Sequence, residues 1–227
     1  MRRSTVTLAA AATCVLTAGC VVTGNAESAK PTGSMIPRPL VERELASLLL
    51  NPEHVNAAMG TTGMTVTESQ SVMSDNSATM SPPECLAIDG AAEAPVYANS
   101  GYWAERDQSL NNGNAFTHYL KQAVVLFPTT EMAGAFFEAS AQQWLSCHEY
   151  THTQSGSQWT VGEIKNAAAA LSVVATQQNA DAAGWGCGRA LALRNNIIVD
   201  INTCSADPAD SAARIAGQIA DDVTSRW

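Results

Sequence analysis

The sequence predicts an α+β domain with a largely antiparallel sheet, N- and C-terminal helices, one central helix and two disulfides. Helical periodicity occurs near both ends of the domain and once near its middle. The segments between these helices are short, rich in β-branched or aromatic residues, and separated by hairpin-type turns. Because the sequence lacks the regular strand–helix alternation of a parallel sheet, these observations together favour the α+β class.

Residues 1–19 are predicted to be a bacterial secretory signal peptide. Arg2 and Arg3 supply the positive charge that such signals carry, and a short Ala-rich apolar run follows from Leu8 to Leu16. This run is too short to span a bilayer, which needs about 20 apolar residues. The signal therefore predicts export rather than membrane insertion.

Cys20 is the predicted lipidation site. Residues 16–20 resemble a lipobox, in which small residues precede a cysteine that receives acyl chains, palmitate among them, and becomes the new N-terminus. Thr17 stands where an aliphatic residue is usual, so an ordinary secretory signal with an unmodified Cys20 is the alternative.

The mature chain is expected to consist of a lipid-anchored flexible tether, residues 20–38, and one folded domain, residues 39–227. The tether has almost no apolar periodicity, and the remaining length suits a single domain. The net charge is −9 and becomes −11 once residues 1–19 and their two arginines are removed. Such an acidic chain excludes nucleic acid as a partner, and its attachment to a membrane would depend on the lipid alone.

Four helical segments are expected in the domain. The first starts at Pro39 and is interrupted by Asn51-Pro52, and a second short helix ends at Gly60. The central helix follows Pro128 and ends near Cys147. The closing helix is capped by Asp207-Pro208 and carries one apolar stripe made of Ala212, Ile215, Ala216, Ile219 and Val223.

The expected strands are short and linked by turns. The clearest hairpin joins residues 190–193 and 197–201 through the reversal Arg194-Asn195-Asn196. Pro82–Cys85 is an expected turn, and the ambiguous segment 97–110 is assigned to a strand because of Tyr102 and Trp103. The other strands are expected at residues 64–69, 116–127, 150–153, 159–164 and 171–176.

Four cysteines remain once Cys14 leaves with the signal and Cys20 is acylated: Cys85, Cys147, Cys187 and Cys204. Four thiols in an exported chain favour two disulfides, for which the sequence allows three pairings. A zinc site is the disfavoured competitor because the chain has no C-x-x-C knuckle.

The string from His148 to His152 matches H-E-x-x-H, in which two histidines one helical turn apart bind zinc and the glutamate polarises water. Its composition favours a strand, on which the two imidazoles would stand about 13 Å apart and could not hold one ion. No histidine follows His152 as a third ligand. We therefore expect neither a metal nor catalytic residues here, and a secreted zinc-dependent hydrolase is kept as an alternative.

The C-terminal half resembles the PknH-like extracellular sensor domain family, which includes the outer domain of a mycobacterial receptor kinase and stand-alone lipoproteins. The resemblance covers residues 39–227 and implies an α+β fold, disulfides Cys85–Cys147 and Cys187–Cys204, a cleft for a small polar ligand, and no catalytic residues or cofactor. The segments that carry it are 123–128, 187–191 and 195–200, together with Ala133, Phe136, Trp144, Cys147 and Cys204.

The sequence thus predicts a lipid-anchored, extracytoplasmic, sensor-like domain of the mycobacterial cell envelope that binds a small polar ligand or an envelope protein. Trp185, Arg189 and Asn196 are the candidate ligand-binding residues because they flank the predicted hairpin. Besides the hydrolase, a protein-interaction module of the envelope is the second alternative, and it predicts a contiguous exposed apolar patch.

Overall fold

The computed structural model describes residues 37–226. The predicted signal, Cys20 and nearly all of the predicted tether lie outside the described residues. Within 37–226 no helix combines the length and the apolar character needed to cross a membrane.

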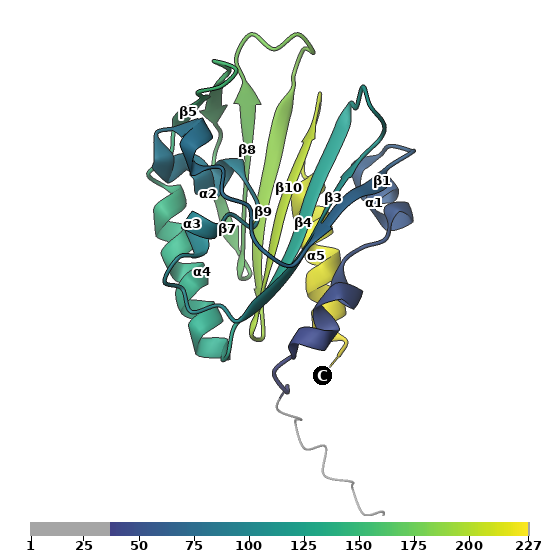
Figure 1. Cartoon of the computed structure of the whole chain (residues 1–227), viewed down its shortest axis with the longest axis vertical. Helices are drawn as coiled ribbons and strands as arrows, with labels where there is room; N and C mark the ends of the chain where they lie inside the picture. Colours follow the sequence, from purple (N-terminus) through teal and green to yellow (C-terminus); the bar gives the residue numbers. More distant parts are fainter. Residues whose placement is uncertain (1–36, 227) are drawn as a thin grey trace, which may run out of the picture. The chain divides into compact units, whose positions relative to one another are not determined.

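The described domain is built on one antiparallel sheet of ten strands (Figure 1). The strands follow one another across the sheet in the order β1-β3-β4-β10-β9-β8-β6-β5-β2, and β7 pairs with β8 outside this path. Their bounds are β1 Thr65–Gln70, β2 Met80–Ser81, β3 Ala104–Asn111, β4 His118–Leu126, β5 Glu149–His152, β6 Gln158–Val161, β7 Lys165–Ala167, β8 Ala170–Gln177, β9 Gly186–Arg194 and β10 Ile197–Ser205.

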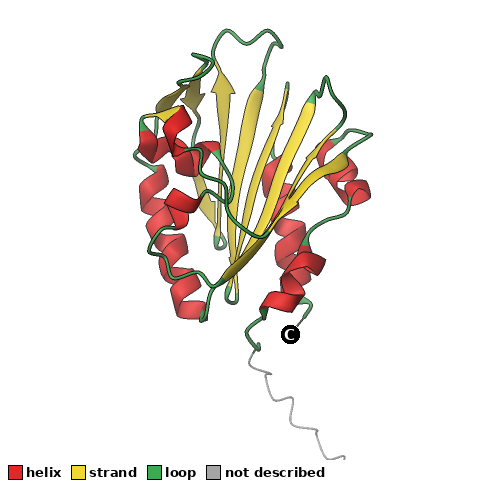
Figure 2. Cartoon of the chain, viewed as in Figure 1, coloured by secondary structure: helices red, strands yellow, loops and turns green. Residues whose placement is uncertain are grey.

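Helices cover both faces of the sheet (Figure 2). One face carries η1, α1 and α5, and the other carries α2, α3 and α4. Their bounds are η1 Glu42–Leu48, α1 Pro52–Met59, η2 Ser77–Thr79, η3 Pro83–Cys85, α2 Leu86–Asp89, α3 Ala94–Tyr97, α4 Thr130–Trp144 and α5 Ser211–Thr224.

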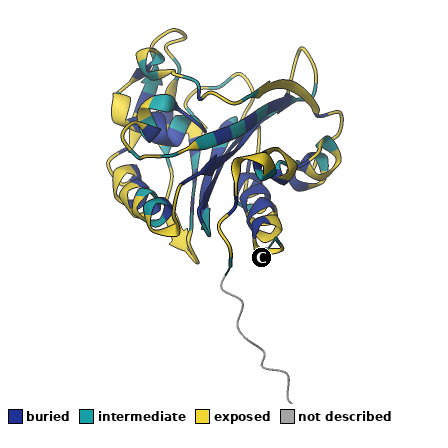
Figure 3. Cartoon of the chain, turned by 60° about the horizontal axis from the view of Figure 1, so that its bottom comes forward, coloured by how far each residue is buried: buried dark blue, intermediate teal, exposed yellow. Residues whose placement is uncertain are grey.

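The central strand β10 separates two hydrophobic clusters. Its nine residues are all buried, and successive side chains point to opposite faces of the sheet. Ile198 packs with the α4 side, in a cluster that contains Trp144, whereas Val199 packs with the α5 side. Figure 3 shows the buried residues on the sheet and on the inner sides of the helices, while the outer sides are exposed.

Local sequence signals account for most of these elements. Helix α1 begins with Asn51, whose side chain accepts a hydrogen bond from the His54 amide, and it ends at Gly60 with a φ of 65°. The Thr129 hydroxyl accepts a hydrogen bond from the Met132 amide and caps α4. The β9–β10 hairpin turns at Asn195, whose φ of 53° is one that asparagine tolerates. The fold class and these three predicted elements are confirmed.

Several details of the prediction are wrong. The strand assigned to residues 97–110 begins at Ala104, so Tyr102 and Trp103, the residues that favoured it, precede it. The two-residue strand β2 was not predicted. The first helical segment is a 3-10 helix that begins at Glu42 rather than at Pro39, and the N-cap of α5 is Asp210 rather than Asp207. The stretch from Pro83 to Tyr97 contains η3, α2 and α3, which the sequence did not predict because four-residue helices show no period. The short, exposed strand β7 was also not predicted.

The four domain cysteines form two disulfides, paired as the resemblance implies. Cys85 at the end of η3 is bonded to Cys147, which follows α4. Cys187 and Cys204 are directly opposed residues of β9 and β10. The first bond therefore fixes the η3–α2 segment to α4, and the second joins the two central strands at the end away from their turn.

Candidate functional site

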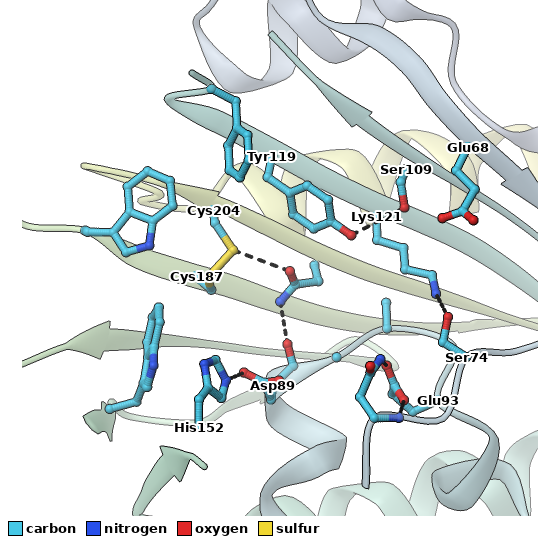
Figure 4. A pocket seen from close by; sticks show the side chains of 17 residues that line it. Glu68, Ser74, Asp89, Glu93, Ser109, Tyr119, Lys121, His152, Cys187 and Cys204 are labelled. Carbon is cyan, nitrogen blue, oxygen red and sulfur yellow. Dashed lines mark hydrogen bonds and ion pairs between the residues drawn. A yellow bond between two sulfur atoms is a disulfide. The ribbon is translucent and has the colours of Figure 1, made fainter. Parts of the chain in front are cut away.

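A cavity of about 390 Å³ lies over the ends of the central strands (Figure 4). One row of its floor crosses β4, β10 and β9 through Tyr119, Cys204 and Cys187. The next row crosses β1, β3, β4 and β10 through Glu68, Ser109, Lys121 and Asn202. Antiparallel register thus places polar side chains from four strands beside a disulfide. We call this cavity the cleft.

The segment that follows α2 forms a wall of the cleft. The Asn202 amide donates a hydrogen bond to the Asp89 carbonyl oxygen (2.9 Å), which attaches the end of α2 to the sheet. The Glu93 carboxylate accepts hydrogen bonds from the Asn76 backbone amide (2.9 Å) and side-chain amide (2.7 Å). Burial raises the pKa of Glu93, although both bonds from Asn76 act in the opposite direction.

Lys121 is the cation at the floor of the cleft. Its Nζ donates a hydrogen bond to the Ser74 hydroxyl (3.0 Å) and lies 3.7 Å from Asp107 Oδ2. Lys121 and Asp107 are both nearly inaccessible, and burial raises the pKa of Asp107 while Lys121 lowers it. Lys121 is therefore held by groups of the protein itself.

His152 lies on the opposite side of the cleft, beside aromatic rings. Its Nε2 lies 2.8 Å from Asp89 Oδ1, and this hydrogen bond raises the pKa of His152 against the effect of burial. The ring lies 5.6 Å from both Tyr150 and Trp159, measured between ring centroids. Phe116 and Trp185 complete the aromatic lining. The cleft thus offers hydrogen-bonding groups and ring faces, which suits the binding of a small molecule.

Of the three candidate ligand-binding residues, the structure places only Trp185 at the cleft, where it is half-buried. Arg189 instead lies in the protein interior, where it forms an ion pair with Asp200 and donates to the Ile201 carbonyl oxygen (2.9 Å). Its guanidinium carbon lies 5.5 Å from the centroid of the Trp144 ring. This corrects the expectation that Arg189 lines a common cleft with Trp185.

Asn196 also lies outside this cleft, although it lines a second cavity at the other end of the sheet. It lies at the turn of the β9–β10 hairpin, at the end opposite the cleft, and is buried. Its side chain binds both backbone groups of Leu40, at 2.8 and 3.1 Å, and donates to the Phe127 carbonyl oxygen at 2.9 Å. Asn196 therefore fixes the start of the domain to the sheet. Its position beside the predicted hairpin did not show whether Asn196 lies at the turn or at the opposite end of the hairpin.

The H-E-x-x-H string lies on and before a strand, as its composition predicted. His148 and Glu149 are exposed, whereas His152 is half-buried and bonded to Asp89. Among residues 37–226 no group of three or more His, Cys, Asp or Glu side chains is arranged to hold a metal ion.

The sequence argument missed most of the polar residues of the cleft. Their signal was the presence of polar residues within apolar strands, as for Lys121 in β4 and Asn202 in β10. A buried polar residue in a strand usually has a partner or a function. No such signal marked Asp89 and Glu93 as residues of the cleft, because the segment that contains them shows neither helical nor strand periodicity.

A second, more apolar cavity of about 670 Å³ lies near the β9–β10 turn, and Leu40, Val41 and Trp103 are among its lining residues. Trp103 is 71% exposed there. Its lining also includes Glu42, Arg43, Arg106 and Asn196, but Glu42 and Arg106 form an ion pair with each other and the Asn196 side chain is bonded to backbone groups. We therefore regard the cleft as the candidate site for a small polar ligand.

Comparison with known proteins identifies the family. The model of the PknH-like extracellular domain matches residues 40–222. The chain is 36% identical over 220 residues to the serine/threonine-protein kinase PknH of Mycobacterium bovis (strain ATCC BAA-935 / AF2122/97) and to that of Mycobacterium tuberculosis (strain ATCC 25618 / H37Rv). The alignments cover 95% of this chain but 36% and 34% of these relatives, so the chain spans about a third of their length.

A solved structure shows the same fold. The crystal structure of the extracellular domain of PknH from Mycobacterium tuberculosis matches with a TM-score of 0.78 at 34% sequence identity, covering 83% of this chain and 99% of that one. The family and the two disulfides indicate an extracytoplasmic domain. The chain therefore belongs to the PknH-like extracellular domain family.

Proposed function

We propose that this chain is a lipid-anchored, sensor-like domain that binds a small polar ligand in the cleft and catalyses no reaction on it. The observation that carries the proposal is the cleft itself, in which polar side chains from four strands surround a disulfide and face half-buried aromatic rings. Its volume of about 390 Å³ lies within the range of about 300–1,000 Å³ that is usual for small-molecule sites.

Native mass spectrometry of the protein purified from its own cell envelope tests ligand binding. We expect a small molecule to remain bound to the chain without substitutions and to the Trp103→Ala variant, whose altered residue lies outside the cleft. The Trp185→Ala variant should lose this molecule, because it removes an aromatic face of the cleft. A chain that retains no molecule, or one that Trp185→Ala retains fully, would contradict the proposal.

The lipid anchor is tested separately with Cys20→Ala. Acyl chains contribute about 0.8 kcal/mol per buried CH₂, so loss of the acylated cysteine should release the protein from the membrane fraction. The acidic chain has little electrostatic attraction to an anionic membrane that could replace the anchor. If Cys20→Ala stays in the membrane fraction to the same extent as the unmodified chain, the lipid anchor is refuted and ligand binding is unaffected.

One observation favours a second function, that of a protein-interaction module. Trp103 is 71% exposed in the apolar cavity, and exposed tryptophans often anchor protein interfaces. If Trp103→Ala, and not Trp185→Ala, abolishes the binding of an envelope protein, this second function is supported in place of small-molecule binding.

A further inference from the structure

The carboxylates of the cleft outnumber its cations. Glu68, Asp89 and Glu93 line the cleft, whereas Lys121 and His152 are the cationic or titratable basic side chains that do so. Figure 4 shows Glu68, Glu93 and Lys121 toward one end of the cleft, and Asp89 with His152 toward the other. A ligand therefore meets an excess of negative charge.

Both basic groups are already paired with other carboxylates. Lys121 lies 3.7 Å from Asp107, which is buried next to the floor on the same face of the sheet, and His152 is bonded to Asp89. Within residues 37–226, neither Glu68 nor Glu93 takes part in an ion pair. These two carboxylates are the charges of the cleft that a ligand could neutralise.

Of these two carboxylates, Glu93 is expected to attract a cation more strongly than Glu68. It is 3% exposed, and its hydrogen bonds come from the neutral donor Asn76. A buried carboxylate that lacks a cation is destabilising, and a charge brought to it interacts strongly because the local dielectric constant is low. An ammonium group at Glu93 would therefore gain more than the same group would at an exposed carboxylate.

Two buried carboxylates next to the floor, on the same face of the sheet, add to the negative potential. Asp107 and Glu105 are each 1% exposed, and their carboxylate oxygens accept no hydrogen bond from the described residues. Lys121 is the cation that lies between Asp107 and the cleft. An anionic ligand would have to use Lys121 in competition with Asp107 and against Glu93, so the arrangement disfavours anions.

The aromatic rings supply a second contact for a cation. Trp185 is half-buried and Phe116 is 44% exposed, so both keep accessible ring surface at the cleft. The face of an aromatic ring attracts a positive charge, and an indole does so best. The same rings also pack against the C–H groups of a compact organic ligand.

Resting on the proposed binding function, we propose that the ligand is a small organic cation whose ammonium group lies at Glu93 and Glu68 and whose body packs against Trp185. This assigns a charge class to the ligand and a recognition role to Glu93.

Three probes that share one ring and differ in charge test this assignment: glucosamine, glucose and glucuronate. Saturation-transfer NMR and titration calorimetry on the full chain should show glucosamine binding about tenfold or more tightly than glucose, the smallest preference that one charge-assisted contact would give. Glucuronate should bind most weakly of the three, and added salt should reduce the preference for glucosamine.

Five variants, two at glutamates and three at tryptophans, locate the binding. Glu93→Gln keeps the size of the side chain and should remove the preference for glucosamine, while Glu138→Gln, an exposed change on α4, should leave it intact. Trp185→Ala should weaken glucosamine, Trp185→Phe should retain part of the affinity, and Trp103→Ala should have no effect. Far-UV circular dichroism checks that each variant is folded.

Several outcomes would overturn the assignment. A preference for glucose or glucuronate would refute the charge class, and glucosamine binding unaffected by Glu93→Gln would place the cation elsewhere on the acidic surface. If none of the probes binds but native mass spectrometry shows a neutral or anionic molecule that Trp185→Ala loses, the cationic assignment fails and the binding function stands. If neither experiment shows any ligand, the binding function itself fails.

Discussion

Glu105 lies on β3, one residue before Arg106, and is buried on the α4 side of the sheet, where its strand partner Val125 packs. Burial, followed by the neighbouring charge of Asp107, raises its pKa from 4.5 to about 7, and Lys121 and Arg106 oppose this rise. Because the folded state holds the proton more tightly than the unfolded state, this group contributes stability below pH 4.5. That contribution is lost as the pH rises through about 7.

Glu105→Gln should therefore stabilise the protein at pH 8 and have little effect at pH 5. The expected gain in the free energy of unfolding at pH 8 is up to about 3 kcal/mol, since one pKa unit corresponds to about 1.4 kcal/mol. Urea unfolding at the two pH values measures it. Glu138→Gln, an exposed change, serves as the control. An equal effect of Glu105→Gln at both pH values would show that the carboxylate does not titrate in this range.

Arg189 is predicted to act in stability rather than in ligand binding. Arg189→Met leaves Asp200 buried with hydrogen bonds only from Tyr97 Oη (2.8 Å) and the Ala92 amide (3.0 Å). Breaking a buried ion pair in this way costs about 3–5 kcal/mol.

The double variant Arg189→Met/Asp200→Asn should recover most of that loss, because no unpaired charge remains. Urea unfolding of the double variant measures its stability. Titration with the molecule found by native mass spectrometry measures whether the double variant still binds it. A double variant that is stable but no longer binds this molecule would show that Arg189 takes part in ligand binding.

At the scale of elements, the two disulfides hold different parts of the fold. Cys187–Cys204 closes 17 residues and Cys85–Cys147 closes 62, so their loss should cost about 3 and about 4 kcal/mol on the chain-entropy model. In the Cys187→Ser/Cys204→Ser variant, hydrogen exchange should increase at the cleft end of β9 and β10 and remain slow near Asn195. Equal exchange along the whole hairpin would show that the bond does not act locally.

The other disulfide provides the matched comparison. The Cys85→Ser/Cys147→Ser variant should show faster exchange in η3, α2 and the end of α4, with the β9–β10 hairpin unchanged. The wall of the cleft would then move while its floor stays in place. Increased exchange in the hairpin would contradict this separation.

Elements with a repeated pattern were predictable from the sequence, and those without one were not. Helix α5 shows an apolar stripe over about three turns, and the β9–β10 hairpin has an asparagine reversal between apolar runs, so both were predicted. Helices α2 and α3 are four residues long and depend on tertiary contacts, of which the hydrogen bond from Asn202 to Asp89 is one. Such contacts between distant residues leave no periodic signal.

At the scale of the whole domain, the absence of a signal for contacts between distant residues also explains which residues of the cleft could be predicted. Trp185 lines the cleft because it stands beside the strand that carries Cys187, whereas placing Arg189 and Asn196 required knowledge of strand direction and register. The cleft combines residues from β1, β4, α2 and β10 that are up to 136 positions apart, as Glu68 and Cys204 are. Antiparallel pairing between strands that are far apart in the sequence brings these residues together.

The arrangement of two clusters around β10 leads to a prediction for the whole domain. The α4-side cluster contains Trp144 and Trp159, whereas the α5-side cluster, as formed by the described residues, contains no aromatic side chain. Both depend on β10, because its alternate residues belong to opposite clusters. One cluster therefore cannot lose its packing on β10 without removing the support of the other.

We accordingly expect one cooperative unfolding transition. Tryptophan fluorescence of a Trp103→Phe/Trp227→Phe variant, which keeps Trp144, Trp159 and Trp185, follows the α4-side cluster. Far-UV circular dichroism follows the helices and strands of both sides. The two urea transitions should coincide in midpoint and slope. Val199→Ala, which removes two methyl groups from the α5-side cluster alone, should shift both transitions by the same amount, a loss of about 1–3 kcal/mol. If circular dichroism shifted while tryptophan fluorescence did not, the two sides of the sheet would unfold independently, and β10 would not couple them.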